Sequence, residues 1–271
     1  MGLITDKVDT RLGSIVVRSG GPDDAPVLVY FHSAAGEGEA FTLLDALATD
    51  HRVVAPMFPG FDASEGLEEI DDMEDAVFHL IDLWDRLDLG APVVAGLSLG
   101  GWLALELATR YPERVGGLAL INPVGLHFDD APIADIFGRS PGLLAEDFFA
   151  DQQHPLAQMM HAVSEFEADI ATAGEIPFEM LEPYVTRLAA TARLGWNPYL
   201  HNPKLAGRLW RISCPTVVIR ATEDTLVPAE HARYYANHIE GAALIEVPGL
   251  AHLAPIEDPA PVAAAIRKVL P

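Results

Sequence analysis

Apolar runs and segments with helical spacing alternate through the first half of the chain. Runs that are apolar throughout suit strands covered on both faces, whereas an apolar residue at every third or fourth position indicates a helix with one buried face. The expected strands cover residues 13–18, 26–31, 53–56, 92–95 and 115–121, and the expected helices cover residues 41–48, 68–87 and 102–109. This alternation predicts a doubly wound, mostly parallel α/β sheet.

The alternation stops near Leu126 and returns at Thr216. The intervening segment consists of short helical pieces broken by prolines, contains many aromatic residues and methionines, and has no clear strand. After it we expect a strand, a helix, a strand and a C-terminal helix at residues 216–220, 229–238, 243–247 and 259–270. We therefore divide the chain into a first part of the core (1–125), a helical lid or cap (126–209) and a second part of the core (210–271).

Composition and charge narrow the possible partners. The 271 residues are 50% hydrophobic, and 17 basic against 40 acidic residues give a formal net charge of −23. That charge disfavours nucleic-acid binding and adsorption to anionic membranes. There is no long apolar span, no secretory signal pattern at the N-terminus, and a single cysteine, Cys214, which fits a reducing compartment. We expect a cytoplasmic monomer or homodimer that acts on a small molecule.

Residues 93–101 read Val-Val-Ala-Gly-Leu-Ser-Leu-Gly-Gly and carry the strongest chemical signal. They contain the G-x-S-x-G pattern between a predicted strand and a predicted helix, which is the context of a nucleophile elbow. The helix that follows directs its unpaired N–H groups toward the serine, where negative charge would develop. Ser98 is therefore the candidate nucleophile.

A serine hydroxyl needs a base, and the base needs an orienting carboxylate. Asp224 lies a few residues beyond one predicted strand, on a loop closed by Pro228, and His252 lies on the loop after the next strand. Because the carboxyl ends of parallel strands meet at one edge, both residues should lie near Ser98. The neighbouring Glu223 is the alternative acid. After the strand at 115–121, another position where an acid could stand holds Asn122.

With these features the sequence resembles the α/β-hydrolase superfamily over essentially its whole length, in particular serine hydrolases with a helical lid, such as esterases and C–C bond hydrolases. The segment Tyr-Phe-His-Ser-Ala-Ala-Gly at 30–36 is similar to the family's His-Gly-rich loop. The segment Phe-Pro-Gly-Phe-Asp-Ala-Ser at 58–64 resembles its Pro-Gly-aromatic-Gly-x-Ser turn. Two residues depart from the pattern, because Ser33 and Asp62 stand where the family usually has glycine.

The resemblance implies a role for each candidate. Ser98 would be the nucleophile, His252 the general base and then acid, and Asp224 its orienting partner. The backbone N–H groups of Ala34 and Leu99 would form the oxyanion hole, and the cap would follow the sixth strand. We expect no cofactor and no metal, because glycine-rich phosphate loops and metal-ligand spacings are absent. The substrate-binding residues stay open, and the lid candidates are Arg187, Arg193 and Trp196.

The leading hypothesis is a serine hydrolase, carboxylesterase-like, that cleaves a small to medium, mainly apolar carboxylic ester or related acyl compound through an acyl-enzyme on Ser98. The first alternative is a C–C bond hydrolase for ring-cleavage products, which are vinylogous diketone acids. Such anionic substrates require a cationic anchor, for which Arg187 or Arg193 are the candidates. The second alternative is a ligand sensor on the same fold with slow turnover. Dehalogenase and epoxide-hydrolase chemistry is disfavoured, because those relatives carry aspartate at the elbow.

Overall fold

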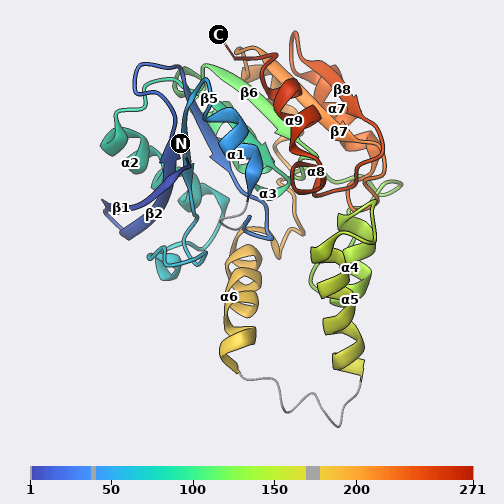
Figure 1. The fold of residues 1–271 in the computed structure, drawn as a ribbon. Coiled ribbons are helices and arrows are strands. Elements are labelled where there is room, and N and C mark those ends of the chain that lie inside the picture. The colour runs from blue at the N-terminus through green and yellow to red at the C-terminus, as the bar shows by residue number, and fades with distance from the viewer. Residues whose placement is uncertain (1, 38–40, 169–177, 271) are drawn as a thin grey trace.

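Eight strands form one sheet in this computed structural model, which describes residues 2–37, 41–168 and 178–270 (Figure 1). The spatial order is β1-β2-β4-β3-β5-β6-β7-β8. β1 pairs antiparallel with β2 and β2 with β4, and all remaining neighbours are parallel. The strands are β1 (Ile4–Thr10), β2 (Gly13–Gly20), β3 (Val27–Phe31), β4 (Arg52–Pro56), β5 (Val93–Leu97), β6 (Gly117–Ile121), β7 (Thr216–Ala221) and β8 (Ala243–Val247).

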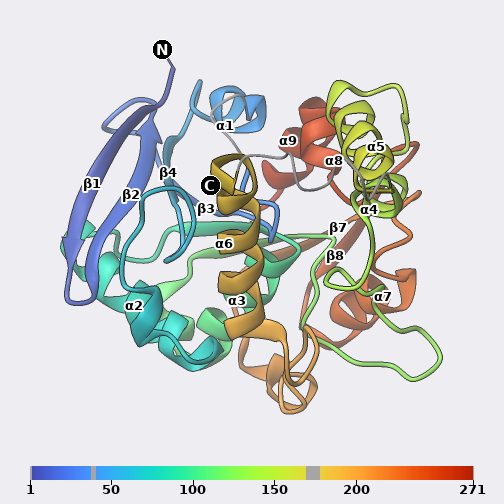
Figure 2. The same cartoon turned by 90° about the horizontal axis from the view of Figure 1, so that it is seen from below.

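Helices cover both faces of the sheet, so the chain has two apolar cores rather than one (Figure 2). Side chains alternate between the cores along each strand: Val29 and Phe31 join one, whereas Leu28 and Tyr30 join the other. One core is closed by α2 (Met73–Leu87), α3 (Leu99–Arg110) and α7 (Ala229–His238), the other by α1 (Thr42–Leu47), α8 (Ala254–Glu257) and α9 (Pro259–Ile266). The predicted doubly wound α/β class is confirmed.

Three elements differ from the sequence prediction. β1 was missed because its residues are mostly exposed and carry no apolar run. The acidic helix starts at Met73 rather than at residue 68, because the Asp72 carboxylate accepts hydrogen bonds from the amides of Glu74 and Asp75 and so caps it there. At the C-terminus the helix predicted for 259–270 ends at Ile266, and the short α8 precedes it.

A helical insertion separates β6 from β7, as the resemblance implied. It contains α4 (Pro141–Phe148), α5 (Pro155–Ala168), α6 (Phe178–Gly195) and the 3₁₀ helix η4 (Ala206–Arg211). α4 and α5 lie side by side, and Figure 1 shows α5 and α6 extending away from the sheet. None of the helices in the described part of the chain has the length and apolarity needed to cross a membrane. The boundaries 126 and 209 of a separate cap stay a prediction.

Candidate active site

Ser98 lies in the tight turn between β5 and α3. Its φ of +55° and ψ of −111° are rare for a residue with a side chain, and such a conformation costs about 1–3 kcal/mol. The nearby glycines are required by close backbone contact. A Cβ on Gly96 would lie 2.4 Å from the Gly100 carbonyl oxygen, and one on Gly100 would lie 2.3 Å from that of Phe31. The strained turn therefore exists because the residues around Ser98 are small.

Asp224 and His252 form a buried hydrogen-bonded pair beyond the ends of β7 and β8. His252 Nδ1 lies 2.9 Å from Asp224 Oδ2, and both side chains are almost fully buried. The other carboxylate oxygen of Asp224 accepts hydrogen bonds from the amides of Leu226 and Val227, both at 2.9 Å. A carboxylate only accepts, so Nδ1 of His252 carries the proton and Nε2 is left as the basic nitrogen. Glu223, the alternative acid, is exposed and accepts from the hydroxyl of Thr222.

Asn122 holds the histidine loop close to the serine turn. Its side-chain amide donates to the carbonyl oxygen of His252 at 2.9 Å, and its Oδ1 accepts from the amide of Ala221 at 2.9 Å. Ile121, the residue before Asn122, accepts a hydrogen bond at its carbonyl from the amide of Ser98, also at 2.9 Å. Ser98 and His252 therefore both adjoin residues 121–122. Among the hydrogen bonds of the described residues, none joins their side chains directly; such contacts are often long without substrate.

The loop after β3 is held in place by a buried glutamate that the sequence analysis did not single out. Both carboxylate oxygens of Glu37 lie 3.0 Å from the amide nitrogen of Ser33, which donates to them. The Ser33 hydroxyl accepts from the amide of Ala35 at 3.0 Å. Burial raises the pKa of the Glu37 carboxyl. In the sequence, an acidic residue on a loop is expected to be exposed to solvent. The contact between Glu37 and the Ser33 amide is therefore visible only in the structure.

The amides of Ala34 and Leu99 are the two predicted oxyanion-hole donors. Neither amide donates a hydrogen bond to any described residue. Leu99 is the first residue of α3, where an amide has no partner within the helix. Ala34 lies between Ser33 and Ala35, whose amides are both bonded within the loop. Both predicted donors are thus left available for an external acceptor.

His32 is a structural residue of the same loop. Its Nε2 accepts from the amide of Phe58 at 3.0 Å, so the proton lies on Nδ1, which donates to the Ser33 carbonyl at 2.7 Å. The ring packs between Phe58 and Phe61. Burial lowers the pKa of the imidazole to about 4, so the ring is neutral at neutral pH. His32 therefore joins the β3 loop to the turn after β4.

The three lid candidates lie in different surroundings. Arg187, on α6, donates to the carbonyl of Ala35 at 3.3 Å and to Asp62 at 3.2 Å. Arg193 donates to the carbonyl of Ile70 at 3.1 Å and pairs with Asp71 at 3.3 Å. Trp196 is 63% exposed and lies against Phe137. Of the three, only Arg187 contacts the predicted oxyanion loop.

The insertion also contacts the histidine loop. Phe148, at the end of α4, stacks on the His252 ring at a centroid distance of 6.0 Å. Asp147 accepts from the hydroxyl of Thr225 at 2.8 Å and pairs with Arg139. The carbonyls of residues 147 and 148 accept from the amides of His252 and Leu253. One end of the insertion is therefore anchored to the loops that carry His252 and Asp224.

The described residues contain no group of three or more histidine, cysteine, aspartate or glutamate side chains arranged to hold a metal ion. Cys214 is partly buried, and burial raises the pKa of its thiol. The loops around Ser98 carry backbone amides, the imidazole of His252 and the carboxylates of Asp224 and Glu37. Such an arrangement suits acyl transfer by a serine nucleophile.

The family model described as alpha/beta hydrolase fold matches residues 26–259, so the chain belongs to this family. A pimeloyl-[acyl-carrier protein] methyl ester esterase from Chromobacterium violaceum is 31% identical over 239 residues, 84% of this chain and 87% of that protein. A 2-hydroxymuconate semialdehyde hydrolase from a Pseudomonas species is 28% identical over 208 residues, 74% of this chain and 70% of that protein. A solved serine hydrolase involved in carbazole degradation shares the fold, with a TM-score of 0.77 at 18% identity, covering 99% and 98% of the two chains.

Proposed function

We propose that this chain is a serine hydrolase that cleaves a carboxylic ester through an acyl-enzyme on Ser98. The observation that carries the proposal is the buried pair of His252 and Asp224 beside the strained elbow. His252 Nε2 takes the hydroxyl proton as Ser98 attacks the carbonyl carbon, and then delivers it to the leaving alcohol. Water, deprotonated by the same nitrogen, attacks the acyl-enzyme and releases the acid. Asp224 holds the tautomer and stabilises the imidazolium.

The amides of Ala34 and Leu99 supply the oxyanion hole in this proposal. Because they donate to no described residue, no internal bond has to break when the tetrahedral intermediate forms. Donors fixed before the reaction act on charge that appears only in the transition state, and losing one costs about 10²- to 10³-fold in kcat. Glu37 fixes this loop by binding the Ser33 amide, which would otherwise be a third donor.

We further propose that residues 126–209 form a lid over the site and that the substrate is small to medium and mainly apolar. Support comes from Phe148, an apolar side chain of the insertion that lies against the His252 ring. Aliphatic and aromatic residues of the insertion would bind the acyl or alcohol part, as is usual for small-molecule sites. Relatives named as methyl ester esterases, one of them 31% identical, are consistent with an ester substrate.

The C–C bond hydrolase alternative is supported by relatives such as the 28% identical semialdehyde hydrolase and a 2-hydroxy-6-oxo-2,4-heptadienoate hydrolase that is 36% identical over 104 residues. It requires a cation that can reach a substrate carboxylate. Arg193 is engaged away from Ser98, with Ile70 and Asp71, and Arg187 is bound to Asp62 and Ala35. Within the described part of the chain, neither guanidinium has a hydrogen bond to a residue of the serine turn, which favours the ester over the ring-cleavage product.

Hydrolysis of short p-nitrophenyl esters by wild type and by Ser98→Ala tests the proposal. We expect steady multiple turnover by wild type and a fall of kcat by about 10⁴-fold or more in the variant. Full activity in Ser98→Ala would overturn the serine mechanism. A wild-type progress curve that stops after about one turnover would instead favour the sensor. Preferred turnover of a vinylogous diketone acid, lost in Arg187→Gln, would favour the C–C bond hydrolase.

A further inference from the structure

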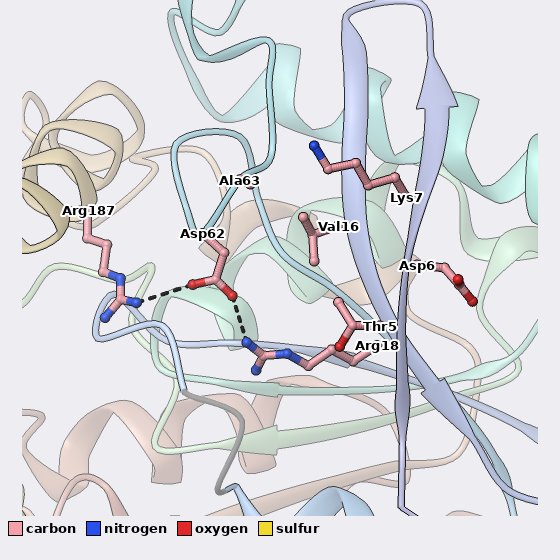
Figure 3. A pocket seen from close by; sticks show the side chains of 8 residues that line it. All are labelled: Thr5, Asp6, Lys7, Val16, Arg18, Asp62, Ala63 and Arg187. Carbon is pink, nitrogen blue, oxygen red and sulfur yellow. Dashed lines mark hydrogen bonds and ion pairs between the residues drawn. The ribbon is translucent and has the colours of Figure 1, made fainter.

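A pocket lies at the edge of the sheet, between the β1–β2 hairpin, the turn at 58–64 and helix α6 (Figure 3). Its volume is about 700 Å³, within the range of about 300–1,000 Å³ that is usual for small-molecule sites. Arg18, Asp62 and Arg187 line it together with residues of β1. Ser98, Asp224 and His252 do not line it, so it is distinct from the proposed active site.

Three of the eight residues that line this pocket, Lys7, Arg18 and Arg187, are cationic, and two, Asp6 and Asp62, are acidic. Thr5 pairs with Arg18 and Lys7 with Val16 across the hairpin, so these four side chains share one face, while the intervening Asp6 belongs to the other. Figure 3 shows Asp6 directed away from Asp62. Lys7, Arg18 and Arg187 thus share the pocket lining with two carboxylates, of which only that of Asp62 is directed toward the arginines. An excess of positive charge at one place is unexpected in a chain of net charge −23.

The arginines also have more donors than the protein uses. Arg18 donates to the Glu37 carbonyl at 2.8 Å and to Asp62 at 2.6 Å, but its Nε is buried without a partner among the described residues. The Arg18 side chain is only 10% exposed. Arg187 donates one hydrogen from each terminal nitrogen, to Ala35 and Asp62. Each terminal nitrogen carries a second hydrogen, and Lys7 pairs with no described carboxylate.

The geometry points to this pocket as a binding site for a small organic anion with two or more carboxylate or phosphate groups. One group of the ligand accepts hydrogen bonds from Arg18 and Arg187, whose planar guanidinium groups suit such oxyanions. A second group is bound by the ammonium of Lys7, which lies at the other end of the pocket (Figure 3). The ligand supplies the negative charge that Asp6 and Asp62 do not provide for the three cations.

Calorimetric titration of the full chain tests this site, with citrate and inorganic phosphate as probes and sodium chloride keeping the ionic strength constant. Ser98→Ala serves as the parent, so the result does not depend on turnover or on the proposed hydrolase activity. We expect saturable binding of one citrate per chain. Citrate should bind more tightly than phosphate, because it offers two groups to the two ends of the pocket. Equal affinities, or no saturable binding of either anion, would overturn the proposal.

Lys7→Met and Lys204→Met form a matched pair for locating the bound anion. Both lysines are exposed, and Lys204 lies outside the pocket. We expect Lys7→Met to weaken citrate binding about five- to tenfold, as for loss of a charge-assisted hydrogen bond near the surface, and Lys204→Met to leave it unchanged. Backbone amide shifts in NMR spectra should move at residues 5–7 and 18. Equal affinities in the two variants, or shifts confined to the turn at Ser98, would contradict the assignment.

Discussion

Two tryptophans show how differently the core and the insertion of this chain are built. Trp102 follows Ser98 by one helical turn, is almost fully buried, and donates from Nε1 to Glu106 at 2.9 Å. That carboxylate is also buried and accepts from Asn202 and Arg110. Trp196, at the end of α6, is 63% exposed and contacts only the Phe137 ring among aromatic side chains of the described residues. At these two positions the core holds a polar group in a buried network, whereas the insertion leaves an apolar side chain in solvent.

This difference separates two kinds of function. Acyl transfer needs groups held in one geometry, and the buried contacts of Asp224, Asn122 and Glu37 provide that. Substrate choice needs apolar surface that a ligand can cover. The insertion exposes such surface at Leu143, Leu156, Met159, Val163, Val185 and Trp196. We propose that the core carries out the chemistry and that the insertion determines the substrate preference.

The largest expected effect is a loss of kcat on substitution of Asp224, the proposed acid of the triad. Asp224→Asn should lower kcat by about 10⁴-fold, because the amide cannot stabilise the imidazolium and favours the wrong tautomer. Glu223→Gln is the matched control, since this neighbour is exposed and its carboxylate accepts from the hydroxyl of Thr222. It should change kcat by less than about twofold. Similar losses in both variants, measured with a p-nitrophenyl ester, would refute the assignment of the acid.

Substitutions of Trp102 and Trp196 test, through the free energy of unfolding, whether the core is packed more tightly than the insertion. Trp102→Phe leaves Glu106 without one donor and opens a cavity, so the free energy of unfolding should fall by about 2–4 kcal/mol. Trp196→Phe should change it by less than about 0.5 kcal/mol. Urea unfolding monitored by circular dichroism gives both values. Equal losses would show that the insertion is as tightly packed as the core.

The free energy of unfolding should depend on pH partly through His32. The pKa of this buried ring is about 4, while the unfolded chain has the ordinary value near 6.5. As pH falls from 7.5 to 5, the unfolded state therefore binds a proton that the folded state refuses, which destabilises the fold by about 2 kcal/mol. Wild type should lose that much more stability over this range than His32→Gln, measured by urea unfolding. Parallel curves for the two proteins would contradict the buried, neutral imidazole.

The smallest expected effect concerns Glu37. Glu37→Ala removes both acceptors of the Ser33 amide, so the oxyanion loop loses its fixed position and kcat should fall about tenfold. Glu37→Gln keeps one acceptor oxygen and should recover part of that loss. KM should change little in either variant, because the loop acts on the transition state. A rise in KM at constant kcat would show that Glu37 affects substrate binding instead.

The sheet and the elbow could be predicted because their causes are local. Solid apolar runs mark β3, β5 and β6, and the glycines around Ser98 mark a turn that only small residues permit. β1 could not be predicted, because an exposed edge strand needs no apolar pattern. The contacts of Glu37, Asn122 and Arg18 join residues distant in sequence or on irregular loops, and no periodicity encodes them.

Ser33 and Asp62 stand where the family usually has glycine, and only the structure shows what these two side chains do. Ser33 gives both its amide and its hydroxyl to hydrogen bonds within the loop. Asp62 adopts a φ of +49°, a conformation that glycine accepts freely, and its carboxylate binds Arg18 and Arg187. Sequence alone marks these positions as exceptions, whereas the partners of Ser33 lie within its own loop and those of Asp62 lie on β2 and α6.

Covalent labelling tests the central claim most directly. Wild type and Ser98→Ala are treated with a fluorophosphonate, and the intact mass and the modified peptide are determined. Attack by an activated serine predicts one adduct per wild-type chain, on Ser98, and none on the variant. Absence of an adduct on wild type, or labelling of a residue other than Ser98, would contradict the proposed nucleophile and the mechanism built on it.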